Sequence, residues 1–122
     1  MAKKALFEAI SIMGKAFASP TRLEILDLLA QAPRTVDELA KASGQSNANT
    51  SQHLQALYAA GMVSRALEGT SVRYSLAGEE ALALWLALRD ASVAQLGRSS
   101  ALRGITWAPT SRRSTATSSL RG

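Results

Sequence analysis

The sequence has no cysteine, which excludes disulfide bonds, thiolate metal sites and thiol redox switches within these 122 residues. Histidine occurs once, at His53, and there is no glycine-rich phosphate loop. With so few groups suited to catalysis, an enzyme is the least favoured class of protein. No apolar run approaches the roughly 20 residues that span a bilayer, and charges interrupt the N-terminal segment where a signal peptide is apolar. We therefore expect a cytoplasmic protein without a membrane partner.

Acidic residues are absent from residues 98–122. The formal net charge is +5, but residues 1–97 contain nine basic and nine acidic side chains, so the whole positive excess lies in the five arginines of residues 98–122. This segment is rich in Ser, Thr and Arg and lacks the apolar periodicity of a packed core. We predict a folded domain over residues 1–97 and a basic, disordered tail over residues 98–122.

Apolar residues spaced three and four apart predict amphipathic helices over residues 5–18, 20–32 and 79–96. The second begins at Ser19-Pro20, because serine caps a helix and proline suits the first helical position. A β-hairpin precedes the third, since residues 62–66 and 71–76 alternate in polarity around a turn at Gly69. The repeating apolar positions are Leu6, Ile10, Met13 and Phe17, then Leu23, Leu26 and Leu29, then Leu82, Trp85, Leu86, Val93 and Leu96.

Residues 33–61 have the pattern of a helix-turn-helix. Thr35 and Glu38 are spaced as a capping box at the start of a short helix, which Gly44 can end by adopting a left-handed conformation. Ser46 then caps a second helix that Gly61 ends. Two helices joined by such a tight turn are typical of DNA-binding proteins. The inward face of the second helix is predicted to consist of Thr50, Leu54 and Leu57.

Residues 17–76 read FASPTRLEILDLLAQAPRTVDELAKASGQSNANTSQHLQALYAAGMVSRALEGTSVRYSL and resemble the ArsR/SmtB family of bacterial winged-helix regulators. The motifs that carry the resemblance are SPTRLEIL, TVDELA, TSQHLQAL, AGMV and the hairpin that ends in YSL. The resemblance implies a mainly α fold with a small β-hairpin, in the order α-α-α-α-β-β-α of a winged helix-turn-helix. It also implies a homodimer formed through the first and last helices and a near-palindromic DNA operator.

Two departures from the family bear on function. Many members sense metals through Cys on the DNA-proximal helices or through His and carboxylates on the last helix, and those ligands are absent here. Tyr58 and Ala59 replace a basic residue often found after the TSQHLQAL motif. Metal sensing is therefore not implied by the resemblance, although a divalent metal effector such as nickel or zinc at an atypical site stays open.

The second helix of the helix-turn-helix carries the expected DNA contacts. On a helical wheel, Ala48, Asn49, Gln52 and Gln55 lie opposite the buried face. Amide side chains both donate and accept toward adenine in the major groove, and a small residue lets the helix approach the bases. In an isolated helix these amides would be a solvated face, but the preceding turn and the following hairpin favour DNA. The helix N-terminus favours phosphate contacts from Ser46, Asn47 and Ser51.

Four basic residues and the histidine each have two interpretations. Arg65 and Arg73 flank the hairpin tip, where a wing follows DNA, and a purely solubilising role has equal weight. His53 lies at the edge of the buried face and is interpreted as a phosphate contact or a packing residue, because a metal site needs several convergent ligands. Arg22 and Lys41 fit phosphate contacts and ordinary surface ion pairs equally well.

The first and last predicted helices expose more apolar surface than a small core can cover, which indicates a second subunit. Trp85 has two interpretations, an anchor of the dimer or the wall of a pocket for an apolar effector. The expected interface residues are Leu6, Ile10, Met13, Phe17, Leu82, Trp85, Leu86 and Val93.

Our main hypothesis is a sequence-specific transcriptional regulator that binds operator DNA as a homodimer. The alternative is a protein-interaction module on the same scaffold that acts through a co-regulator protein. The neutral charge of residues 1–97 supports the alternative, because DNA binders owe much of their affinity to phosphate neutralisation. No motif identifies the effector, the operator sequence, or the choice between repression and activation.

Overall fold

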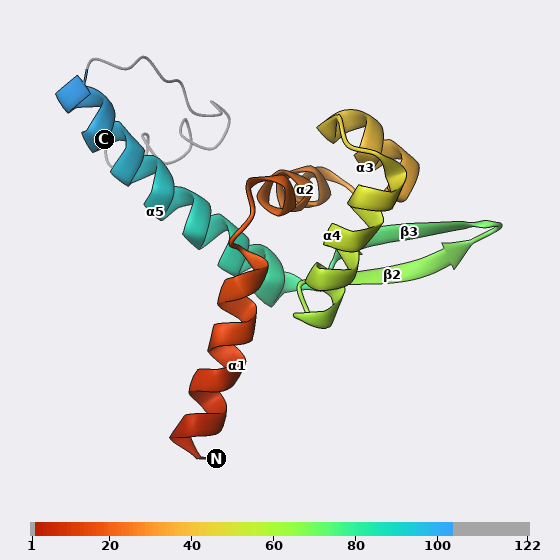
Figure 1. Cartoon of the computed structure of the whole chain (residues 1–122), viewed down its shortest axis with the longest axis horizontal. Coiled ribbons are helices and arrows are strands. Elements are labelled where there is room, and N and C mark those ends of the chain that lie inside the picture. The colour runs from red at the N-terminus through yellow and green to blue at the C-terminus, as the bar shows by residue number, and fades with distance from the viewer. Residues whose placement is uncertain (1, 104–122) are drawn as a thin grey trace. The chain divides into compact units, whose positions relative to one another are not determined.

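The computed structural model describes residues 2–103 (Figure 1). The predicted order of helices and hairpin is confirmed, with one short strand added before the third helix. In chain order, the elements are α1 (Lys3–Ala16), α2 (Pro20–Gln31), β1 (Arg34–Thr35), α3 (Val36–Ser43), α4 (Asn47–Ala59), β2 (Val63–Glu68), β3 (Ser71–Leu76) and α5 (Glu79–Arg103).

Capping side chains determine where α2 and α3 begin. The Ser19 hydroxyl accepts a hydrogen bond from the Arg22 backbone N–H at 3.3 Å, and Pro20 follows at the first helical position. At α3, Thr35 Oγ1 accepts from the Glu38 backbone N–H at 3.2 Å, while Glu38 Oε1 accepts from the Thr35 N–H at 2.9 Å. Both predicted starts are confirmed. Each capping side chain stabilises its helix because it accepts from a backbone N–H that the first turn leaves without a partner.

The hydrophobic core lies among α2, α3, α4 and the start of β2. In α2, Leu26 and Leu29 are buried as predicted, but Leu23 is only half-buried and Ile25 is completely buried. The reason is that α2 packs against α3, α4 and β3 together, so more than one narrow stripe of the helix is covered. The largest fully buried side chains are Ile25, Leu26, Leu39, Thr50, Leu54, Leu57 and Met62.

The three strands form one antiparallel sheet in the order β1-β3-β2. Along the hairpin, the register pairs Val63 with Leu76 at one end and Glu68 with Ser71 at the other, and Gly69 takes a φ of +63° in the turn. On the other edge of β3, Arg34 pairs with Tyr74. The sequence did not predict β1, because two residues carry no periodicity and only their pairing with β3 makes them a strand.

The last helix, α5, extends further than its sequence pattern indicates. We expected it to end near Leu96, but it continues to Arg103. Gly97 weakens a helix without breaking it as proline would, and the guanidinium of Arg98 donates to Gln95 Oε1 one turn earlier. The predicted end of the helix near Leu96 is therefore wrong. The predicted disorder of residues 98–122 stays a prediction, and residues 104–122 lie outside the described residues.

The chain divides into two compact units, with the boundary inside α5 between Trp85 and Leu86. All of the helix-turn-helix and the wing lie in the first unit. No helix within residues 2–103 combines the length and the apolar character needed to cross a membrane.

Candidate nucleic-acid interface

The turn between α3 and α4 determines where α4 begins. Gly44 ends α3 with a φ of +74°, a left-handed conformation that glycine adopts without strain. The Gln45 N–H then donates to the Ala40 carbonyl at 3.1 Å, and Ser46 Oγ accepts from the Asn49 N–H at 3.0 Å. The predicted helix-turn-helix is thus confirmed, and the turn redirects the chain within three residues, from Gly44 to Ser46.

Helix α4 has one fully buried face and one exposed face. Its inward face consists of Thr50, Leu54 and Leu57, as predicted. The Thr50 hydroxyl reaches back to the Ser46 carbonyl at 2.8 Å, so the one polar group on this face is satisfied. Ala48, Gln52 and Gln55 are exposed on the opposite face. We call these three residues the recognition ridge.

Asn49 differs from its neighbours on the recognition ridge. It is half-buried, and its Nδ2 donates to Gln45 Oε1 in the preceding turn. Its amide is therefore occupied by a contact within the chain. At the helix N-terminus, Asn47 is exposed and Ser51 is half-buried, while the Ser46 hydroxyl serves as the cap.

The wing begins beside α4 through a contact between Arg65 and Tyr58. The Arg65 guanidinium lies 4.0 Å from the centre of the Tyr58 ring, a cation–π arrangement. A hydrogen bond with Tyr74, the cross-strand partner of Arg65, raises the pKa of the guanidinium. Tyr58 occupies a place where the family often has a basic residue, and here its ring holds a cation supplied by β2. This pairing was not predicted from the sequence.

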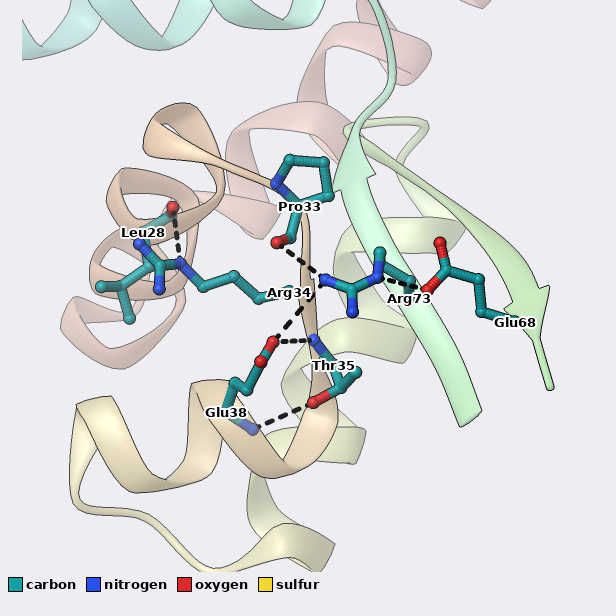
Figure 2. Close-up of polar contacts among 7 residues, drawn as sticks. All are labelled: Leu28, Pro33, Arg34, Thr35, Glu38, Glu68 and Arg73. Atoms are coloured by element: carbon teal, nitrogen blue, oxygen red, sulfur yellow. Dashed lines mark hydrogen bonds and ion pairs between the residues drawn. The ribbon is translucent and has the colours of Figure 1, made fainter. Parts of the chain in front are cut away.

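Arg73, on β3, joins the wing to the start of α3, as Figure 2 shows. Its Nε lies 2.9 Å from Glu68 Oε1 across the hairpin, and its Nη1 lies 3.8 Å from Glu38 Oε1. Nη1 also donates to the Pro33 carbonyl at 3.3 Å. The Glu68 carboxylate raises the pKa of Arg73. The Arg73 guanidinium is thus engaged by two carboxylates and a carbonyl, unlike that of Arg65.

Besides capping α3, Glu38 forms an ion pair with Arg73, which its capping motif did not indicate. The backbone N–H of Thr35 holds the pKa of the Glu38 carboxyl below its ordinary value, and the charge of Arg73 acts in the same direction. Nearby, Arg34 Nε donates to the Leu28 carbonyl at 3.1 Å, near the C-terminal end of α2 (Figure 2). Glu38 and Arg34 therefore hold the segment between α2 and α3 in place.

Arg22 connects three helices. Its Nε donates to Nδ1 of His53 on α4 at 3.3 Å, and its Nη1 donates to the Lys15 carbonyl at the end of α1 at 3.0 Å. Lys41 instead forms an exposed ion pair with Asp37, at 3.4 Å on the same helix. Both basic residues thus have partners within the chain.

Comparison with known proteins identifies the family. Residues 19–65 match the model of a family described as bacterial regulatory proteins, arsR family. A crystal structure of a possible transcriptional regulatory protein (fragment 1–100) from Mycobacterium bovis is 40% identical; the match covers 75% of this chain and 98% of that one, with a TM-score of 0.71. This chain belongs to the ArsR family. It is therefore a member of a family of bacterial regulatory proteins.

Two further matches bear on assembly and length. A solution structure of a homodimeric winged helix-turn-helix DNA-binding domain, Mb0332 from M. bovis, is 36% identical with a TM-score of 0.68, and the match covers 88% of this chain and 94% of that one. The HTH-type transcriptional regulator Rv0324 of M. tuberculosis is 43% identical over 83 residues, which are 68% of this chain. The chain spans only 37% of the length of Rv0324.

In this ArsR-family chain, α1 leaves its apolar side chains uncovered. Phe7 and Ile10 are 62% and 55% exposed, and Leu6 is also exposed. A groove of about 420 Å³ runs beside them. It is lined entirely by α1 and α5 residues and by Phe17, namely Ala9, Ile10, Met13, Gly14, Phe17 and Leu84.

The predicted interface residues of α5 are less exposed than those of α1. Trp85 is only 7% exposed, and its Nε1 is buried without a hydrogen-bond partner among the described residues. It does not line the 420 Å³ groove. Leu82, Leu86 and Val93 are half-buried.

Metal ligands do not gather in the described part of the chain. Within residues 2–103, no three side chains of His, Cys, Asp or Glu lie together as a metal site requires. The nickel or zinc effector stays a prediction.

Proposed function

We propose that the chain regulates transcription as a homodimer that recognises a near-palindromic DNA operator. The recognition ridge of α4 carries this proposal, because it places two amides and a small residue on the exposed face of the helix that follows the tight turn. Gln52 and Gln55 would donate to and accept from base edges, and Ala48 would let the backbone of α4 approach them.

Phosphate contacts would hold α4 in its groove. The first turn of α4 carries the side chains of exposed Asn47 and half-buried Ser51 at the positive end of the helix, which suits phosphate oxygens. Arg65 adds a cation at the root of the wing, with no carboxylate partner among the described residues. The side chain of Arg73 is instead committed to Glu68 within the wing and to Glu38 in α3.

A homodimer would present two recognition ridges to successive major grooves, about 10 bp apart. The apolar face of α1 supports this assembly, because Phe7 and Ile10 are too exposed for a helix that remains in water. The homodimeric state of the Mb0332 domain is consistent with it. The groove beside Ile10 and Met13 would be covered by the second copy.

Selection of duplexes from a random library by the purified full chain tests the proposal. We expect enrichment of a sequence with two-fold symmetry, and we expect competition by random DNA to be at least 1,000-fold weaker, roughly the lower bound for specific regulators. Sedimentation at the same protein concentration should report a dimer. Equal competition by random DNA would refute sequence recognition.

The alternative, a protein-interaction module that needs a co-regulator, has one observation in its favour. Arg22, Arg34 and Arg73 are all engaged within the chain, which leaves fewer cations for phosphate neutralisation. The same selection discriminates between the two functions, because a module of this kind enriches no duplex. Repeating the competition with Ni²⁺ or Zn²⁺ tests the predicted metal effector.

A further inference from the structure

The hydrogen bond between Arg22 and His53 determines where the imidazole carries its proton. A guanidinium has five N–H donors and no acceptor, so Nδ1 of His53 must be the acceptor in this 3.3 Å contact. A neutral imidazole has one proton, which then resides on Nε2. Neutral His53 is thus held in one tautomer, in which Nε2 carries the proton and can donate a hydrogen bond.

The Nε2 atom of His53 reaches the surface. No hydrogen bond to it occurs among the described residues, and it is not among the buried side-chain atoms of residues 2–103 that lack a partner, where Trp85 Nε1 is found. His53 is half-buried, and it sits on α4 between the buried Leu54 face and the exposed Gln52 of the recognition ridge. A donor at the flank of a recognition helix faces the wall of the groove, where phosphates lie.

Arg22 is itself held in place from two sides. Its Nη1 donates to the Lys15 carbonyl at 3.0 Å, and its backbone N–H is capped by the Ser19 hydroxyl. Because the guanidinium is planar and rigid, fixing Nη1 on α1 also fixes the direction of Nε toward His53. The orientation of the imidazole therefore depends on the junction between α1 and α2.

We propose that Arg22 is a positioning residue for DNA contact: by occupying Nδ1 of His53, it keeps the proton of the neutral imidazole on Nε2, and this N–H donates to a phosphate oxygen of DNA bound along α4. This rests on the proposed function for the DNA contact, but the tautomer does not depend on it. The contact adds a neutral donor to the interface, and it releases no counterion as a lysine or arginine would.

Nitrogen-detected NMR of the full chain tests the tautomer without any DNA. At alkaline pH, we expect the His53 ring to show a protonated Nε2 and an unprotonated Nδ1. In Arg22→Met, which removes the donor and keeps an unbranched side chain, the two tautomers should become mixed. A dominant Nδ1–H form in the unaltered chain would overturn the proposal.

Binding to a fluorescent random-sequence duplex of about 30 bp tests the phosphate contact, because such contacts are independent of sequence. In His53→Gln, the amide reaches the place of Nε2 and should preserve affinity. In His53→Asn, the amide reaches only the place of Nδ1, and affinity should fall about three- to tenfold. The slope of log affinity against log salt should not change. A slope smaller by about one would indicate a cationic histidine instead and would overturn the neutral-donor assignment.

The variants also separate positioning from structural support. Arg22→Met should weaken binding, but by less than His53→Asn does, because a mixed tautomer population still contains the Nε2–H donor. The double variant should be no weaker than His53→Asn alone, because both changes act on one interaction. Additive losses would contradict a positioning role. If Arg22→Met fails to fold, the tautomer of the unaltered chain and the affinities of the two His53 variants still test the proposal.

The outcomes distinguish this inference from the proposed function. If the unaltered chain does not bind the duplex, the proposed function and the phosphate contact fail together, and the NMR result alone decides the tautomer. If it binds, and His53→Asn binds equally well, only the contact inferred here is refuted.

Discussion

Arg73 on β3 and Glu38 in the first turn of α3 form an ion pair, 3.8 Å between Nη1 and Oε1, that joins the wing to the helix-turn-helix. Each residue also has a second task in its own element. Glu38 completes the capping box with Thr35, and Arg73 pairs with Glu68 across the hairpin. The orientation of the wing relative to α3 is therefore coupled to the start of that helix.

The two wing arginines should differ in their effect on DNA binding. Arg65→Ala should lower the slope of log affinity against log salt by about one, because Arg65 has no carboxylate partner among the described residues and is free to neutralise a phosphate. Arg73→Ala should leave this slope unchanged, because its charge is already compensated. Fluorescence anisotropy at several salt concentrations measures both, and equal slopes for the two variants would contradict the distinction.

The hydrogen bond from the Thr35 backbone N–H to the Glu38 carboxylate, aided by the charge of Arg73, should make the fold lose stability in acid. The pKa of the Glu38 carboxyl is lowered in the folded chain from a value of 4.5. Its stabilising contribution is therefore fully present above pH 4.5 and is lost as the pH falls through the lower pKa of the folded state. Unfolding by urea at a series of pH values should show this loss.

Glu38→Gln is the matched variant for the acid effect. It keeps the side-chain acceptor of the capping box but cannot titrate, so the decline in its stability below pH 4.5 should be shallower than that of the unaltered chain. If the free energy of unfolding falls equally steeply below pH 4.5 in both proteins, other carboxyls cause the decline.

Gln52 should carry sequence discrimination. Gln52→Ala should lower the preference for the selected operator over random DNA by about 1–3 kcal/mol, the usual contribution of an amide that reads a base. Affinity for random DNA should hardly change. Asn49→Ala is the comparison, because its amide is occupied by Gln45 and its removal should alter discrimination less. A uniform loss on both DNAs in Gln52→Ala would assign this residue to the backbone.

The apolar face of α1 should be required for dimerisation. Ile10→Glu places a charge on the exposed apolar face beside the groove, so sedimentation should shift to the monomer and operator binding should weaken. Ser11→Glu introduces the same charge on the next residue, which is exposed but does not line the groove, and should remain dimeric. A dimeric Ile10→Glu would place the interface elsewhere.

Local chemistry explains why much of the fold was predictable. The capping box at Thr35 and the left-handed Gly44 act within four residues, so their consequences are visible in the sequence. The buried and exposed faces of α4 also follow from helical periodicity, as Leu54 and Gln52 illustrate. Long-range partners left no such signal. The strand β1, the commitment of Arg73 to Glu38 and the stacking of Arg65 on Tyr58 depend on the pairing register of β3 or on helix packing.

The sequence by itself determined the order of the elements, where most of them begin and end, and which face of α4 is exposed, because hydrogen-bonded turns and periodic apolar residues are local features. Only the tertiary structure decided which cations remain free. A guanidinium can pair with any carboxylate or carbonyl that folding brings within reach. Arg22, Arg65 and Arg73 are the same residue type in the sequence but have different partners in the structure. The charge available to a nucleic acid is set by those contacts.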